Sequence, residues 1–267
     1  MRYPAVAGAF YPADRARLAA LLDQLMPAPA TEMAAMGVLV PHAGYVYSGA
    51  CAGAVWNAVA VPERVLLIGP NHTGRGAALA AAEESHWATP LGQLAVDRDL
   101  LEALAARLDL LRFDSRAHSA EHCLEVQLPF IQRRRPDVRI APLVLGVTAA
   151  PTLRAIGRAL AEVIESCPEP RPLIAVSTDM THYESAEVAR EKDRAALDCL
   201  EALDGEALAR VVRQRGISMC GAAGAVVALE ALRIVGARSG KTLGYTHSGE
   251  VTGDDSEVVA YAGMVFC

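Results

Sequence analysis

Histidines and carboxylates follow three apolar segments of the sequence, close to the point where each segment ends. The first two segments lead into PHAGYVYSG (41–49) and GPNHTGRG (69–76), and the third leads into STDMTHYE (177–184). The polar side chains at these ends are Asn71, Asp179 and the histidines His42, His72 and His182. Imidazole binds transition metals and moves protons near neutral pH, and a carboxylate can orient it. Their repetition at the ends of apolar segments predicts one shared pocket.

A cysteine stands in a comparable position. The segment ISMCGAAG (217–224) places Cys220 directly before a predicted helix, where backbone N–H groups and the helix dipole favour a thiolate. A buried structural cysteine is the alternative at this position. The other cysteines lie in Ala- or Leu-rich surroundings, which is typical of packing residues or surface thiols.

A further polar cluster occurs in HSAEHCLEVQLPF (118–130). If residues 118–126 were helical, one helix face would carry His118, Glu121, His122 and Glu125. The string also matches the H-x-x-E-H pattern of some zinc proteases. Pro129 follows soon afterwards, however, and a protease site would leave the other histidines unexplained. We therefore favour a substrate-facing or supporting role for His122 and Glu125.

The elements that must position these residues alternate between strands and helices. Apolar runs predict strands at 37–40, 64–69, 138–145 and 172–178, with a C-terminal pair at 241–251 and 256–266. Helical patterns cover 14–26, 49–60, 97–108, 121–135, 151–165, 186–202, 204–214 and 221–235, and 26–37 is predicted to contain a loop. This alternation predicts one α/β domain over 1–267, with a mixed, largely parallel central sheet and helices on both faces. In such sheets ligands bind at the carboxyl ends of the strands, where the histidines fall.

Composition narrows the class of partner. The chain is 52% hydrophobic and 21% charged, with a net charge of -6, so we expect no nucleic acid and no anionic membrane as partner. The basic run Arg133–Arg135 is predicted to end a helix, where cations offset the helix dipole. Unclustered cysteines, no apolar run long enough to span a bilayer and no secretory signal predict a cytoplasmic protein.

The motifs taken together resemble one family. PHAGYVYSG, IGPNH, TPLGQLAVD, AEHCLEVQLPF, STDMTHY and SMCGAAG, with PAVAGAFYPAD near the start and DSEVVAYAG near the end, are similar to the Memo family. The resemblance covers essentially the whole chain in the same order, which makes it specific. Bacterial and archaeal members are often named as component B of a system that pairs Memo, AMMECR-like and radical-SAM proteins, so a functional link to such partners is implied.

The resemblance also implies a site. The family is similar in fold to class III extradiol dioxygenases, in which two histidines and a glutamate hold non-haem iron, whereas Memo proteins have a cysteine at the third position. Carried over, one metal ion would be held by His42, His72 and Cys220, and catalytic side chains beside it would be Asp179, His182 and His122. We expect the substrate pocket to include Asn71, Tyr45 and Glu125. Iron(II) is the first expectation for the metal, with copper and zinc as alternatives, because a thiolate suits these ions better than magnesium or calcium.

Three functions from different classes remain open. The first is a metal-dependent, dioxygenase-like oxidoreductase of unknown substrate. The second is a non-catalytic adaptor that binds a peptide or small molecule in the same pocket, with Tyr45, Tyr47 and Tyr183 as lining residues. The third, less favoured, is a hydrolase that uses zinc or the Cys220 thiol as nucleophile.

Overall fold

The protein is described by a computed structural model over residues 1–27 and 32–267, and it is built around one mixed sheet. The strands are β1 (Gly37–Val40), β2 (Arg64–Pro70), β3 (Leu79–Ala81), β4 (His86–Thr89), β5 (Gly92–Val96), β6 (Arg112–Phe113), β7 (Arg139–Leu145), β8 (Leu173–Ser177), β9 (His182–Glu184), β10 (Gly240–His247) and β11 (Val258–Phe266). Their main order is β10-β11-β1-β8-β2-β7-β3-β6. The central four, β1, β8, β2 and β7, are parallel, so their carboxyl ends meet at one edge.

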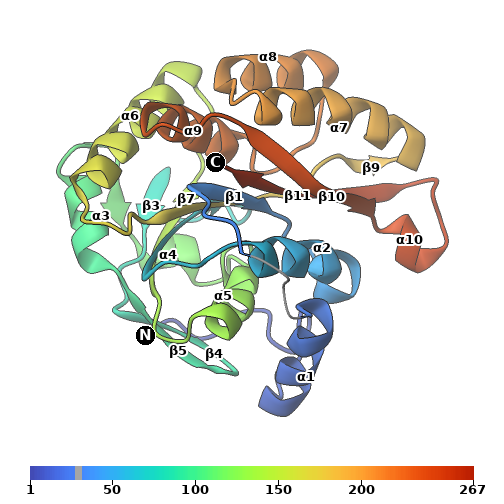
Figure 1. Ribbon diagram of the computed structural model, residues 1–267, viewed down its shortest axis with the longest axis horizontal. Helices are drawn as coiled ribbons and strands as arrows, with labels where there is room; N and C mark the ends of the chain where they lie inside the picture. Colours follow the sequence, from blue (N-terminus) through green and yellow to red (C-terminus); the bar gives the residue numbers. More distant parts are fainter. Residues whose placement is uncertain (28–31) are drawn as a thin grey trace.

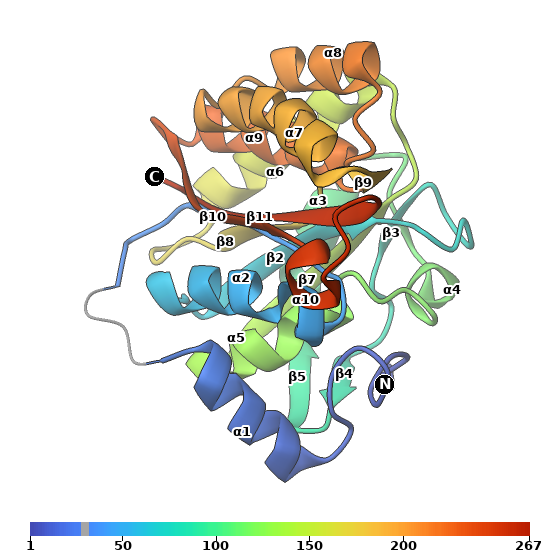
Figure 2. The ribbon, with the colours of Figure 1, turned by 90° about the vertical axis from the view of Figure 1, so that its right-hand side faces the viewer.

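Helices cover both faces of this sheet. They are α1 (Arg15–Leu25), α2 (Tyr45–Ala58), α3 (Arg98–Ala105), α4 (Ser115–His118), α5 (Leu128–Arg134), α6 (Ala150–Ser166), α7 (Ala186–Glu201), α8 (Gly205–Arg215), α9 (Ala222–Ile234) and α10 (Gly249–Thr252), with a 3₁₀ turn at Glu125–Gln127. Helices α6, α7, α8 and α9 lie on one side, and α1, α2 and α5 lie on the other (Figures 1 and 2). This is the α/β class predicted from the alternation of strand and helix patterns.

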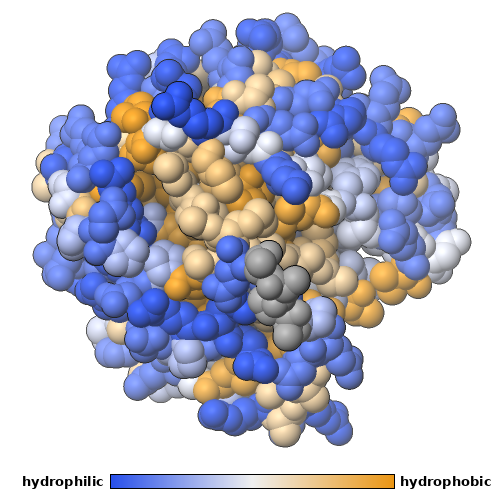
Figure 3. Space-filling view, in the orientation of Figure 1, coloured by the Kyte–Doolittle hydropathy of each residue, from blue (hydrophilic) through white to orange (hydrophobic). Residues whose placement is uncertain are grey.

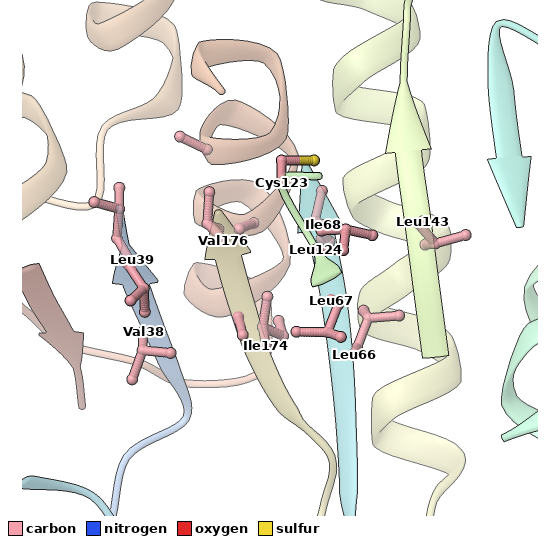
Figure 4. Close-up of a cluster of buried hydrophobic side chains, with 14 of the residues drawn as sticks. Val38, Leu39, Leu66, Leu67, Ile68, Cys123, Leu124, Leu143, Ile174 and Val176 are labelled. Carbon is pink, nitrogen blue, oxygen red and sulfur yellow. The ribbon is translucent and has the colours of Figure 1, made fainter. Parts of the chain in front are cut away.

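The central strands are buried on both faces, as their sequences predict. Every residue of β1 and β8 is buried, and so are the five middle residues of β2. Figure 4 shows side chains of these strands packed together, with Cys123 lying beside Ile68 at the carboxyl end of β2. Outside this core the surface is largely hydrophilic, with apolar side chains gathered near the middle of the face in Figure 3. The strands therefore form a rigid platform whose ends can fix polar side chains.

Two predicted elements differ from the structure in their extent. The predicted helix over 121–135 is broken: α4 ends at His118, a turn follows, and α5 begins only at Leu128. The hydrogen-bonding demands of Glu121 and Glu125, described below, override the helical spacing in this segment. The predicted strand over 241–251 exists as β10 and pairs with β11, as expected, but it ends at His247, and α10 follows it.

Other predicted elements agree with the structure. The basic run at 133–135 ends α5, as expected, and its arginines pair with surface carboxylates. Helix α2 begins at Tyr45, earlier than its Ala-rich pattern indicates. Residues 28–31 of the predicted 26–37 loop lie outside the described residues. Among the helices that the structure describes, none is long and apolar enough to cross a membrane.

Candidate metal centre

Three histidines converge at the carboxyl ends of the parallel strands. His42 follows β1, His72 follows β2, and His122 lies in the turn between α4 and the 3₁₀ turn. One ring nitrogen of each lies within 4.8 Å of the other two. The ring centroids of His42 and His72 are 5.1 Å apart, and His122 is 5.4 Å from His42 and 4.8 Å from His72. The sequence predicted His42 and His72 as ligands and His122 beside them, and the structure brings all three into one cluster.

The hydrogen bonds around His42 fix which nitrogen is available. Ser177 at the end of β8 donates its hydroxyl proton to the Cys123 carbonyl at 2.6 Å. The Nδ1 of His42 lies 3.0 Å from the same hydroxyl oxygen, so Nδ1 must be the protonated nitrogen and donate to it. The Nε2 atom of His42 therefore keeps its lone pair. Burial, together with the other two histidines, holds the pKa of His42 well below its usual value, which keeps the ring neutral.

A buried carboxylate fixes the tautomer of His72 in the same way. Glu121 accepts from His72 Nδ1 at 2.9 Å and from the His72 backbone N–H at 2.7 Å. It also accepts from the backbone N–H groups of His122 and Cys123, at 3.0 and 3.1 Å. Burial opposes ionisation of Glu121, but the hydrogen bonds from His72 and Cys123 lower its pKa to about 2. A carboxylate accepts only, so the Nε2 of His72 is also left with a free lone pair.

The Cys220 thiol lies against one of these imidazoles, that of His42. Among the residues that the structure describes, no set of three ligating atoms within 4.8 Å of one another includes Cys220. Its Sγ is 3.2 Å from His42 Nε2 and accepts a hydrogen bond from the Asp179 backbone N–H at 3.2 Å. Burial, reinforced by the nearby Asp179 carboxylate, raises the pKa of Cys220 to about 12. The expected helix-dipole effect on this thiol is therefore outweighed by desolvation, and a neighbouring cation is the kind of group that would stabilise the thiolate.

Two close contacts explain how these segments reach the site. A Cβ at Gly221 would lie 2.4 Å from Thr178 Cβ, so only glycine lets the start of α9 approach the end of β8 and place Cys220 beside Asp179. A Cβ at Gly69 would lie 2.6 Å from Cys123 Sγ, so glycine in β2 admits the segment that carries His122. At both positions another segment passes directly over the backbone, so no residue with a side chain would fit without a shift.

Asp179 and His182 follow β8 on the same side of the pocket. Asp179 accepts from the His42 backbone N–H at 2.7 Å, and burial raises its pKa to about 7. His182 has a buried Nδ1 with no hydrogen-bond partner in the part of the chain that the structure describes, and burial lowers its pKa. Both line a cavity of about 480 Å³, whose other walls include Phe10, Val46, Tyr47 and His122.

Three expected pocket residues have other contacts. The amide of Asn71 donates to the Arg75 carbonyl and accepts from Thr73, so it shapes the loop after β2. Tyr45 is buried, and its hydroxyl donates to the Val126 carbonyl at 2.6 Å. Glu125 is fully buried and accepts from Tyr11 and from the backbone of residues 5 and 6. The structure does not bring these three polar groups to the cavity beside the histidines.

Sequence reasoning missed one buried arginine that supports the site. Arg2 pairs with Glu125 at 2.8 Å, and its guanidinium donates to the carbonyls of His118 and Glu121 at 2.8 and 2.6 Å. It also lies over the Trp87 ring, 4.4 Å from the centroid. Arg2 therefore holds the turn that carries Glu121 and His122. An arginine this early in a chain gives no sequence signal of its own.

A second set of ligating atoms, from His72, Glu121 and Cys123, also lies within 4.8 Å. Internal hydrogen bonds account for it. The Cys123 thiol donates to the Pro70 carbonyl at 3.2 Å, and Glu121 is occupied by the donors described above. Burial raises the pKa of Cys123 well above its usual value. We therefore assign this set to support of His72.

Fold and site together define an α/β protein with a candidate metal centre at the carboxyl edge of a parallel sheet. Comparison with known sequences assigns the chain to a family. The family described as "Memo-like protein" matches residues 2–265. A MEMO1 family protein of Aquifex aeolicus is 42% identical over 268 residues, covering 100% of this chain and 99% of its relative. Relatives from Methanopyrus kandleri and Methanothermobacter thermautotrophicus are 38% and 36% identical, each over 99% of this chain and over 98% and 99% of the relative. The chain belongs to the Memo family, as its motifs predicted.

Proposed function

We propose that this protein is a metal-dependent oxidoreductase with a mononuclear centre held by His42, His72 and Cys220. The observation that carries the proposal is the pair of fixed tautomers: Ser177 and Glu121 occupy the two Nδ1 atoms and leave both Nε2 lone pairs available. The Cys220 sulfur lies 3.2 Å from one of these nitrogens. Neutral imidazoles backed by hydrogen-bond acceptors are typical of metal ligands.

The donor set fits a transition metal. Two imidazoles and a thiolate suit iron(II), copper or zinc, and iron(II) is our first expectation. When bound, such a metal supplies a Lewis-acidic centre with coordination positions left for substrate or dioxygen. The His122 ring, stacked 4.8 Å from His72, is the alternative third nitrogen ligand, and otherwise it faces the substrate.

The remaining residues supply proton transfer and substrate binding. His182 is held neutral by burial, and its unpartnered Nδ1 makes the ring available to exchange a proton with a substrate hydroxyl. Asp179, with a pKa near 7, can hold or release a proton beside it. Phe10, Val46 and Tyr47 offer apolar surface beside His122 and His182 on which the organic part of a substrate can pack.

The first experiment measures metal binding. Protein purified anaerobically without added metal is titrated with iron(II), copper(I) and zinc(II), and compared with a His42→Ala/His72→Ala double variant. We expect one equivalent to bind tightly to the parent protein and no tight binding to the double variant. His86→Ala is the matched control, because this histidine lies in β4, away from the cluster, and its ring forms a hydrogen bond with the neighbouring Ser85 hydroxyl. Equal binding by parent and double variant would exclude the site.

The second experiment separates the two ligand sets. Cobalt(II) bound by a thiolate gives a sulfur-to-metal charge-transfer band in the near ultraviolet. We expect Cys220→Ser to lose this band and His122→Ala to keep it. Cobalt binding without this band in the parent protein, together with loss of binding in His122→Ala, would replace the His/His/Cys centre by one made of three histidines.

Oxygen consumption distinguishes the enzyme from an adaptor. Iron-loaded protein is assayed for dioxygen uptake with a panel of phenols, and His182→Gln is expected to slow turnover while metal binding is kept. The exposed side chains of Val46 and Tyr47 at the cavity favour ligand binding as the second candidate function. Ligand binding without turnover would support that adaptor role. The link to AMMECR-like and radical-SAM proteins and the cytoplasmic location stay predictions.

A further inference from the structure

A second cleft lies on the helical layer and shares no lining residue with the cavity at the histidines. Its volume is about 690 Å³. Its lining residues come from α6, α8, α9 and the turn between α7 and α8. Helices α6 and α8 both pack on α9, and the three helices lie on the same side of the sheet (Figures 1 and 2). Five arginines line it: Arg154, Arg158, Arg210, Arg213 and Arg233. In a chain with a net charge of -6, this is a local concentration of positive charge.

Most of this charge has no internal partner. Glu230 pairs with two of the five, Arg158 at 3.3 Å and Arg233 at 3.6 Å. Within residues 1–27 and 32–267, no carboxylate lies within ion-pair distance of the other three, which are Arg154, Arg210 and Arg213. Spacing of three residues on α8 puts the last two on the same side of that helix, where like charges repel. An anion bound between them would relieve this repulsion.

Close helix packing fixes the relative positions of the three helices that carry the arginines. A Cβ at Gly157 would lie 2.7 Å from Glu230 Cβ and 2.8 Å from the Val227 carbonyl oxygen, so α6 approaches α9 closely at this point. A Cβ at Gly205 would lie 3.3 Å from the Val226 carbonyl oxygen, so the start of α8 also lies close to α9. The cleft is thus framed by three packed helices, and this packing fixes the backbone positions from which the arginine side chains extend.

Apolar and polar features of the cleft indicate the type of anion. Leu203, Ala209 and Val226 provide an apolar lining beside the arginines. Three carboxylates, those of Asp204, Glu206 and Glu230, face five guanidinium groups, which leaves an excess of two positive charges. The Asp204 carboxylate already accepts from the Ala207 N–H at 2.8 Å, as the cap of α8. A dianion that carries an apolar group matches this lining.

We propose that this cleft binds a phosphate-bearing small molecule of nucleotide size. The planar guanidinium groups of Arg154, Arg210 and Arg213 would contact the phosphate through paired N–H donors. The organic part would lie on the apolar floor formed by Leu203 and Val226. The volume lies within the range of about 300–1,000 Å³ typical of small-molecule sites. The negative charge of the rest of the molecule disfavours a long polyanion.

Calorimetric titration at low ionic strength tests the proposal, with adenosine 5′-monophosphate as the probe and adenosine as its uncharged counterpart. We expect the monophosphate to bind and adenosine not to bind. Arg154→Gln/Arg213→Gln should weaken binding at least tenfold, because each guanidinium supplies charge-assisted hydrogen bonds. Arg15→Gln/Arg116→Gln is the matched control: it removes the same charge from exposed positions outside the cleft and should leave binding unchanged.

Several results would overturn it. If both double variants lose the same affinity for the monophosphate, the effect is one of net charge alone. If adenosine binds as tightly as the monophosphate, the phosphate has no role in binding. Inorganic phosphate that binds as tightly as the nucleotide would exclude the apolar floor. A single-stranded oligonucleotide that binds more tightly than the monophosphate, and is lost in the same variant, would replace the small molecule by a nucleic acid. Thermal unfolding of each variant confirms that the fold is kept.

Discussion

The two walls of the candidate metal centre are built differently. The inner wall, defined by His42, Asp179 and Cys220, extends from the ends of β1 and β8 and the start of α9, and only 2% of the His42 side chain is exposed. The outer wall, defined by His72, Glu121 and His122, is more open, with 32% and 24% of the two histidine side chains exposed. Sheet packing therefore positions the inner wall. A single carboxylate and the Arg2 network position the outer one.

This difference suggests separate tasks. A buried donor set with backbone support binds a metal firmly, since its geometry cannot relax. An open wall held by a few hydrogen bonds admits ligands and solvent. If this difference matters, each wall can be weakened without the other. Substitution of residues that support the outer wall should then leave the contact between Cys220 and His42 intact.

The largest effect is expected from Arg2→Ala. It leaves the fully buried Glu125 carboxylate without its counter-ion, which should cost about 3–5 kcal/mol of unfolding free energy. Urea unfolding measures this. Arg98→Ala is the matched control, because the Arg98–Glu102 pair is exposed and should contribute no more than about 1 kcal/mol. The sulfur-to-cobalt band should persist in Arg2→Ala at saturating metal, and its loss would show that the walls are not independent.

The second largest effect is expected from Glu121→Gln. The neutral amide keeps the shape of the side chain but supports His72 less strongly, so metal affinity should fall by about 10–100-fold. Competition with a chelator measures the change, and Glu102→Gln serves as an exposed control. Unchanged affinity would mean that Glu121 only holds the backbone of its own turn.

Ser177→Ala tests the inner wall in the same way. It removes the acceptor of His42 Nδ1 and frees the tautomer, but the ring stays packed, so we expect a loss of about tenfold or less in affinity. Ser85→Ala is a closely matched control, because its hydroxyl lies 3.1 Å from Nδ1 of the distant His86. A loss larger than that of Glu121→Gln would invert the comparison between the walls.

The smallest effect is expected from Tyr183→Ala. This side chain is 77% exposed on β9, beyond both walls, so metal affinity should be unchanged and stability should shift by less than about 0.5 kcal/mol. Chelator competition and urea unfolding provide the check. A clear loss of metal affinity would extend the site further than either wall.

Strand ends were predictable from sequence because apolar runs and the polar residues after them are local patterns. His42, His72 and Asp179 were found in this way. The helix predicted over 121–135 does not form as one element. Glu121 accepts hydrogen bonds from four N–H groups and Glu125 pairs with Arg2, and these contacts require a turn in place of the helix. Contacts over 100 residues of chain, such as that between positions 2 and 118, leave no local signal. The three-histidine geometry and the arginine-lined cleft likewise emerge only in three dimensions.

The contact between His42 and Cys220 joins positions 178 residues apart in the chain. Before β1, β8 and β2 pair, the proposed ligands His42, His72 and Cys220 lie in separate segments of the chain. Assembly of the sheet, a slow step for a topology rich in distant contacts, must therefore precede formation of the proposed centre. Folding and loading would then be consecutive events: the polypeptide would fold without an ion, and the more open wall would admit it.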